Sequence, residues 1–135
     1  MTAVRFSDWR ERFAAFVERR RSQPFVWGES DCCLFAADGA RELVGEDFAA
    51  PLRGYASAFG AARRLLERGH RHVGEYLDTI LPRATRPRAG DVVLIPAAPV
   101  GALLLFDRAG GAWGQDDAGL VRLRVPRSAK FWSVG

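Results

Sequence analysis

The first 80 residues alternate between apolar and polar positions with the period of an α-helix. The pattern predicts four helices, over residues 7–21, 31–44, 57–68 and 73–80. Ser7 is the expected N-cap of the first helix, and Gly45 and Gly69 are natural stops after the second and third. In the third helix we expect one apolar side, made of Phe59, Ala62, Leu65 and Leu66.

From Thr85 onward the pattern changes to short apolar or alternating runs separated by proline and glycine turns. These runs predict five strands, at residues 91–95, 101–106, 112–115, 120–125 and 131–134. We expect them to form an antiparallel meander. Helices followed by such a sheet belong to the α+β class, in which the helices pack on one face. Because we find no internal repeat or linker, we expect one domain over residues 1–135.

The segment from Phe25 to Phe35, Phe-Val-Trp-Gly-Glu-Ser-Asp-Cys-Cys-Leu-Phe, places a thiol at the start of the second helix. Ser30 or Asp31 can cap this helix, and the helix dipole then favours negative charge on Cys32. A thiol in that position ionises more readily than a free one. The alternative is that Cys32 is simply a small buried residue, because cysteine is often buried. Local chemistry alone leaves both interpretations open.

This segment resembles the nucleophile segment of the NlpC/P60 cysteine peptidases, papain-like enzymes that cut amide bonds in peptidoglycan stem peptides. The matching motifs are Phe-x-Trp-Gly with Asp-Cys at the helix start, the downstream Arg53-Gly54-Tyr55, and the Gly90-Asp91 turn before the first strand. The similarity is closest to a small group found in phages, prophages and gene-transfer particles. It spans most of the chain and implies a papain-like α+β fold.

The resemblance implies three groups in the site: a thiol, an imidazole from the second strand, and a polar residue from the third strand. Cys32 supplies the thiol as the nucleophile. The stretch after the Gly-Asp strand, where the family carries its histidine, has Pro99 in the histidine position. Gln115, near the end of the third strand, is the candidate for the third group. Since glutamine is mostly exposed, we favour the alternative that it is a solvated turn residue.

The chain has two histidines, His70 and His72, and both precede the Gly-Asp strand. The stretch that begins at His72 mimics the missing His-Val-Gly motif, but it carries Glu75 where the motif has an apolar side chain. We therefore interpret His72 as a residue at a solvated helix or loop end. Because bases are recognised by geometry and not by chain order, a base at His72 is the alternative.

Three residues around the thiol are candidates for substrate contacts. In the family arrangement Trp27 and Ser30 line the approach to the thiol, and Asp31 lies beside it. The alternative roles of Trp27 and Ser30 are a packed aromatic side chain and a helix cap. Cys33 stands where the family commonly has serine, about a hundred degrees around the helix from Cys32. We assign Cys33 to the core.

Composition narrows the set of partners. The net charge is +4 and comes almost wholly from arginine, with Lys130 as the single lysine. Residues 19–21 form the one dense cationic run, and no basic stripe interleaved with aromatic residues accompanies it, so we do not expect nucleic-acid binding. Two adjacent cysteines form neither a disulfide framework nor a zinc-ligand pattern. We expect no metal and no cofactor.

The N-terminal segment is charged and amphipathic and has no apolar stretch with a small-residue cleavage site. We therefore expect no signal peptide, and synthesis in the cytoplasm. The longest uncharged run, residues 92–106, contains two prolines and is shorter than the ~20 residues of a membrane-spanning helix. We expect no membrane span.

Together with the resemblance, these observations lead us to expect a tail-associated protein of a phage or a gene-transfer particle. It keeps the thiol but lacks the histidine, and is weak or inactive as a peptidoglycan peptidase. Its expected partners are other tail proteins or peptidoglycan. Two alternatives stay open: an active peptidoglycan endopeptidase or amidase with a non-standard base, and a plain protein-interaction module.

Overall fold

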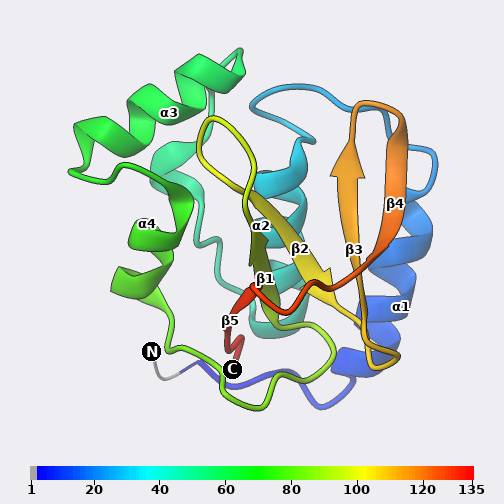
Figure 1. Cartoon of the computed structure of the whole chain (residues 1–135). Coiled ribbons are helices and arrows are strands. Elements are labelled where there is room, and N and C mark those ends of the chain that lie inside the picture. Colours follow the sequence, from blue (N-terminus) through cyan, green and yellow to red (C-terminus); the bar gives the residue numbers. More distant parts are fainter. Residues whose placement is uncertain (1–2) are drawn as a thin grey trace.

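The computed structural model describes residues 3–135, which form an α+β fold (Figure 1). The helices are α1 (Trp9–Arg20), α2 (Cys32–Val44), the short 3-10 helix η1 (Ala50–Leu52), α3 (Ala58–Glu67) and α4 (Val73–Ile80). The strands are β1 (Val92–Ile95), β2 (Ala102–Phe106), β3 (Gly111–Asp116), β4 (Gly119–Arg124) and β5 (Lys130–Trp132). In the described part of the chain no helix is long and apolar enough to cross a membrane. We predicted from the N-terminal segment that the chain has no signal peptide. The first two residues of that segment, Met1 and Thr2, lie outside the described residues.

The five strands form one antiparallel sheet in the order β4-β3-β2-β1-β5. The predicted meander is right for β1 to β4 but wrong for β5, which returns to pair with β1 so that Trp132 lies opposite Val92. The Trp132 side chain explains this return. It is fully buried in the core, and its ring N–H donates a hydrogen bond of 2.9 Å to Asp78, just after the middle of α4. A tryptophan satisfied in both ways anchors the last strand at this edge.

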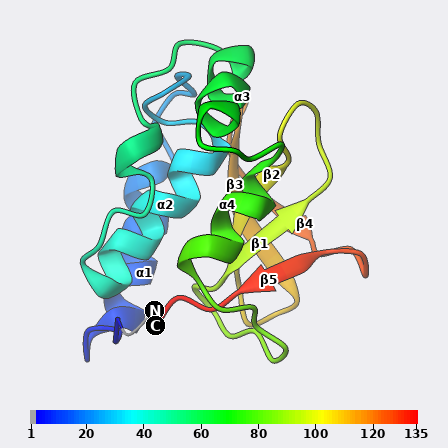
Figure 2. The same cartoon turned by 90° about the vertical axis from the view of Figure 1, so that its left-hand side faces the viewer.

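The helices lie on one side of the sheet, as predicted (Figure 2). Helix α2 contacts both α1 and the central strand β2. The close approach of α2 to β2 depends on Gly39, because a Cβ atom there would lie 2.2 Å from a methyl group of Leu105. Phe16 and Phe35, whose ring centroids are 5.1 Å apart, fill the space between α1 and α2. Helix α2, which carries the two cysteines, is therefore held at the centre of the core.

Two details of the predicted helices are wrong. Helix α1 has Asp8 and not Ser7 as its N-cap. In α3, Ser57 caps the helix, but Phe59 and Leu66 are 80% and 66% exposed. The buried residues of α3 are Ala61 and Leu65, four apart on one stripe, so of these two only Leu65 belongs to the predicted apolar side. The periodicity of the sequence predicted a broad apolar side for α3. Only the side of the helix that includes Ala61 and Leu65 is covered by other parts of the protein.

A buried ion pair between Arg5 and Asp91 joins the two ends of the described chain. The Arg5 guanidinium donates hydrogen bonds to the Asp91 carboxylate at 2.8 Å and to the carbonyl oxygens of Ala89 and Val134, both at 2.6 Å. The Asp91 carboxylate also accepts bonds from the backbone N–H groups of Arg88 and Val134. Burial lowers the pKa of Arg5 to about 10, so its side chain is still charged at neutral pH. The Gly-Asp turn is thus fixed from both sides.

Replacing Arg5 with methionine should strongly destabilise the protein, because the Asp91 carboxylate would stay buried without its cation. We expect the free energy of unfolding to fall by about 3–5 kcal/mol. The matched control is Arg12→Met, which breaks the exposed pair between Arg12 and Asp8 and should cost less than about 1 kcal/mol. Urea unfolding of both variants measures the difference. Equal losses in the two variants would contradict the structural role of Arg5.

Candidate functional site

The carboxylate of Asp31 is the centre of the segment that precedes the thiols. One oxygen accepts a 3.0 Å hydrogen bond from the N–H of Leu34 and so caps α2. The other accepts bonds from the N–H of Gly28 at 2.9 Å and from the Tyr55 hydroxyl at 2.5 Å. Asp31 is 0% exposed. These three bonds hold the aromatic turn, the first turn of α2 and the Arg-Gly-Tyr segment against one another.

Gly28 and Ser30 shape the turn before α2. Gly28 has a φ of +79°, and a Cβ atom there would lie 1.8 Å from the carbonyl oxygen of Tyr55, so only glycine fits. The buried Ser30 hydroxyl donates to the carbonyl oxygen of Pro24 at 2.6 Å and accepts from the N–H of Val26 at 3.0 Å. Asp31, and not Ser30, is therefore the cap of α2, and the Ser30 side chain locks the turn.

Trp27 lies on the outside of this turn. Its ring packs edge-on against Phe25, with 4.8 Å between the ring centroids, and it stays 39% exposed. The ring is packed on one side, as one of our two interpretations expected, and the exposed part is accessible to a partner.

The two cysteines begin α2 and are both half-buried with free thiols. Their sulfur atoms are 4.0 Å apart, within hydrogen-bonding distance. The hydrogen bond with Cys33 is the main cause that lowers the pKa of Cys32, burial opposes it, and the backbone N–H of Leu103 in β2 adds to it. The same hydrogen bond, followed by burial, raises the pKa of Cys33 well above its ordinary value. Ionisation therefore falls on Cys32, where the helix starts.

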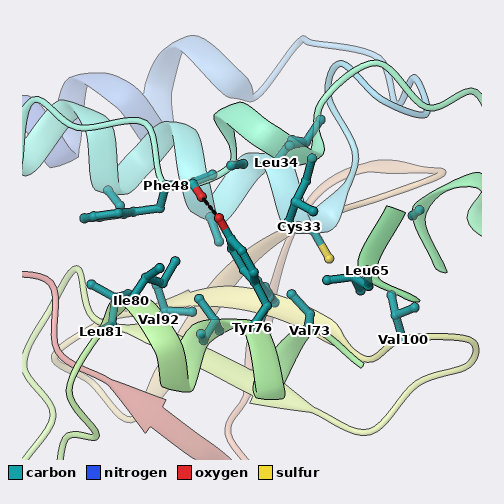
Figure 3. A pocket seen from close by; sticks show the side chains of 18 of the residues that line it. Cys33, Leu34, Phe48, Leu65, Val73, Tyr76, Ile80, Leu81, Val92 and Val100 are labelled. Carbon is teal, nitrogen blue, oxygen red and sulfur yellow. Dashed lines mark hydrogen bonds between the residues drawn. The ribbon is translucent and has the colours of Figure 1, made fainter. Parts of the chain in front are cut away.

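The sulfur of Cys33 points into an apolar cavity of about 50 Å³ (Figure 3). Side chains of α2, α3, α4 and the strands enclose it, among them Leu65, Val73 and Tyr76. At one side the Tyr76 hydroxyl donates a 2.6 Å bond to the carbonyl oxygen of Phe48. Cys33 packs against the core, as we predicted, but its thiol also lines a space suited to an apolar group.

The strand residue beside the thiols is Leu103 and not Pro99. Leu105 of β2 lies opposite Trp113 of β3, so Leu103 and Gln115, each two residues further along its strand, are on the same face of the sheet. The backbone N–H of Leu103 acts on both cysteine sulfurs. Pro99 is an exposed residue of the β1–β2 loop, outside any strand. Pro99, which the resemblance put in the histidine position, thus lies outside the strand, and a buried leucine faces the start of α2.

Gln115 is 2% exposed, so the interpretation as a solvated turn residue is wrong. Its side-chain NH₂ donates a 3.0 Å hydrogen bond to the carbonyl oxygen of Gln23, in the segment that leads from α1 to the aromatic turn. Its side-chain oxygen is buried and has no hydrogen-bond partner in the described part of the chain. The segment around Gln23 covers the end of β3, and the sequence pattern did not reveal this cover. Gln115 thus presents an unused acceptor on the sheet face that carries Leu103.

Both histidines lie in the connection between α3 and α4, as we expected. His72 is the N-cap residue of α4, its side chain is 47% exposed, and its ring nitrogen is 3.9 Å from the Glu75 carboxylate. The ring of His70 packs edge-on against Tyr76. His72 lines an open surface hollow with Pro99 and Lys130, and it does not line the cavity at Cys33, although Val100 lines both.

Tyr55 and Arg53 are the site residues that sequence reasoning missed. Tyr55 binds the cap of α2, and the Arg53 guanidinium donates to the carboxylates of Asp38 at 2.5 Å and Asp47 at 2.9 Å. Asp31 and Asp38 are two helical turns apart on α2, so the segment from Arg53 to Tyr55 binds the same side of the helix at two points. The Arg-Gly-Tyr motif was visible in the sequence, but its partners were not.

A family model described as "Domain of unknown function (DUF6950)" matches residues 4–134. The chain belongs to this family. No curated protein and no solved structure matches the DUF6950 chain. Within residues 3–135 of this DUF6950 protein, no group of three or more His, Cys, Asp and Glu side chains is placed to hold a metal ion.

The hydroxyl of Tyr55 should contribute more to the stability of the DUF6950 fold than that of Tyr76. Tyr55→Phe leaves a buried carboxylate with one donor fewer, so the free energy of unfolding should fall by about 1.5–3 kcal/mol. Tyr76→Phe is the matched control, because its hydroxyl binds a neutral carbonyl oxygen, and should cost about 0.5–1.5 kcal/mol. Thermal and urea unfolding compare the two. A larger loss in Tyr76→Phe would refute the central role of Asp31.

The two thiols should differ in reactivity in the folded DUF6950 protein. Iodoacetamide reacts with the thiolate, so near neutral pH it should label Cys32 far faster than Cys33. Tandem mass spectrometry of the peptide that contains both cysteines locates the label. Urea-unfolded protein is the control and should label both residues at similar rates. Preferential labelling of Cys33 in the folded protein would contradict the assignment.

Proposed function

We propose that this chain is an NlpC/P60-like protein of a phage or gene-transfer particle, with a thiol site that is weak or inactive as a peptidoglycan peptidase. Its role lies in tail-tip assembly or in contact with the cell wall. The observation that carries the proposal is the pairing of Cys32, at the start of α2, with Leu103 on the facing strand. Cys32, the proposed nucleophile, is the first residue of the helix, and the residue of β2 beside it is a leucine.

The missing imidazole matters because amide cleavage needs a proton for the leaving amine. A thiolate can attack the carbonyl carbon, but the thiolate is then a far better leaving group than an unprotonated amine. A positioned general acid and base contributes typically ~10²–10⁴-fold in rate. The side chain of Leu103 has no proton to give, and both histidines lie in the α3–α4 connection. Attack by Cys32 on an amide is therefore expected to reverse more often than it completes.

A binding role is supported by what the site retains. Hydrogen bonds from Gly28, Arg53 and Tyr55 hold the aromatic turn and the start of α2 in place, and none of these bonds needs a catalytic base. Trp27 exposes part of its ring on that turn, and Phe59 and Leu66 are exposed on α3. The tail-associated part of the proposal rests on the resemblance of the Phe-x-Trp-Gly and Arg-Gly-Tyr motifs.

One observation favours a second candidate, an active peptidase that receives its base from a partner chain. The side-chain oxygen of Gln115 is buried on the sheet face that carries Leu103, and it has no hydrogen-bond partner among residues 3–135. A free acceptor there is the group that would orient an incoming imidazole. The first candidate differs from this one in predicting no gain of turnover when neighbouring tail proteins are added.

Purified wild-type protein should release few or no peptides from peptidoglycan, and Leu103→His should raise the rate. The new imidazole would be carried by the strand residue whose backbone N–H lies beside the Cys32 sulfur, so we expect a gain of at least about tenfold over wild type. Pro99→His is the matched control and should give no gain, because residue 99 lies in the β1–β2 loop. Chromatographic analysis of released peptides measures turnover, and thermal unfolding shows whether each variant is folded.

Two further variants make the result decisive. Adding Cys32→Ala to Leu103→His should abolish the gain, since the nucleophile is lost. Robust wild-type turnover that is abolished by Cys32→Ala would instead establish an active enzyme and refute the proposal. If His72→Ala also abolished that turnover, His72 would be the base.

A further inference from the structure

The two thiols at the start of α2 form a pair in two different environments. Their sulfur atoms are 4.0 Å apart, yet the Cys33 sulfur points into the apolar cavity while Cys32 occupies the first position of the helix. Backbone N–H groups without partners within the helix surround that first position, and the positive end of the helix dipole lies there. An apolar cavity offers no such compensation to a charge.

We propose that Cys33 is a positioning residue for Cys32: its S–H donates a hydrogen bond to the Cys32 sulfur, so that the pair keeps one proton and the negative charge rests on Cys32. This inference rests on the proposed function only in taking Cys32 as the nucleophile. When both residues are neutral, the contact runs from Cys32 to Cys33. Loss of the Cys32 proton reverses its direction.

The asymmetry of the pair follows from its surroundings. The charged or titratable groups that act on the pair are the Asp31 carboxylate and the Tyr55 hydroxyl, which itself binds Asp31. Asp31 opposes ionisation of both thiols, and the backbone N–H of Leu103 favours ionisation of both, so neither selects one cysteine. What differs is the position on the helix and the apolar cavity around Cys33. Both differences leave the proton on Cys33.

The pKa directions agree with this geometry. The hydrogen bond between the thiols lowers the pKa of Cys32 and raises that of Cys33 well above its ordinary value. Between the two ionisation steps the pair carries one negative charge. In the NlpC/P60 segment that this sequence resembles, serine commonly stands in this position, and its hydroxyl would also be a donor. Cys33 thus takes over the stabilisation of the thiolate, whereas it supplies no proton to a leaving amine.

The test is the pH dependence of Cys32 alkylation in three proteins: wild type, Cys33→Ala and Cys33→Ser. Cys33→Ala removes the donor, so the midpoint of the pH profile should rise, with labelling at pH 7 roughly tenfold slower for each pH unit of rise. Cys33→Ser keeps a donor and should restore a midpoint near that of wild type. Iodoacetamide is the probe, from pH 5 to pH 10. Absorbance at 240 nm should show one thiolate per wild-type chain formed well before the second.

Three outcomes would overturn the inference. Equal rises in Cys33→Ala and Cys33→Ser would show that Cys33 acts only through packing. Unchanged midpoints in both variants would show that it does not act on Cys32 at all, and simultaneous ionisation of both wild-type thiols would exclude the shared proton. Circular dichroism and thermal unfolding confirm that each variant is folded. Because the assay contains no peptidoglycan, its result is independent of whether the protein cleaves or binds the cell wall.

Discussion

The fully buried carboxylate of Asp31 must be satisfied by donors, because a charge without partners inside a protein is very costly. Three donors meet this demand: Gly28 in the aromatic turn, Leu34 in the first turn of α2, and, from further along the chain, Tyr55 in the Arg-Gly-Tyr segment. Their positions are therefore mutually dependent. The location of Cys32, the next residue along the chain, follows from this arrangement, and so does its orientation toward β2.

Local signals were sufficient for most of the fold. Helix α2 starts and stops as predicted, because Asp31 and Gly45 are a cap and a stop within the segment itself. The hairpins from β1 to β4 were equally readable from their turns. The return of β5 to β1 was not, since it depends on the burial of Trp132 against residues about forty positions earlier in the chain. Which side of α3 is buried likewise depends on the parts of the chain that pack against the helix, and the sequence of the helix alone does not show them.

In the site, too, features set by local signals could be predicted, and features set by contacts between distant segments could not. Cys32 at a capped helix start could be predicted, because cap and thiol are neighbours in sequence. The residue of β2 that faces the thiols could not, because the resemblance pointed to Pro99, which lies in the β1–β2 loop, whereas the backbone N–H of Leu103 lies beside both sulfur atoms. Burial of Gln115 depends on the segment around Gln23, which covers the end of β3. Pairings between distant segments are set by packing, and an alternation of apolar and polar residues does not record them.

The pair of Arg5 and Asp91 has a practical consequence for handling the protein. It fixes residue 5 beside residue 134, at the end of the molecule opposite to the aromatic turn (Figure 1). A fluorescent reporter or a surface tether attached at either terminus would emerge from the same pole. The thiol site and the exposed ring of Trp27 would then face away from the support. Immobilised protein should therefore present the same face to the solution whichever end carries the link.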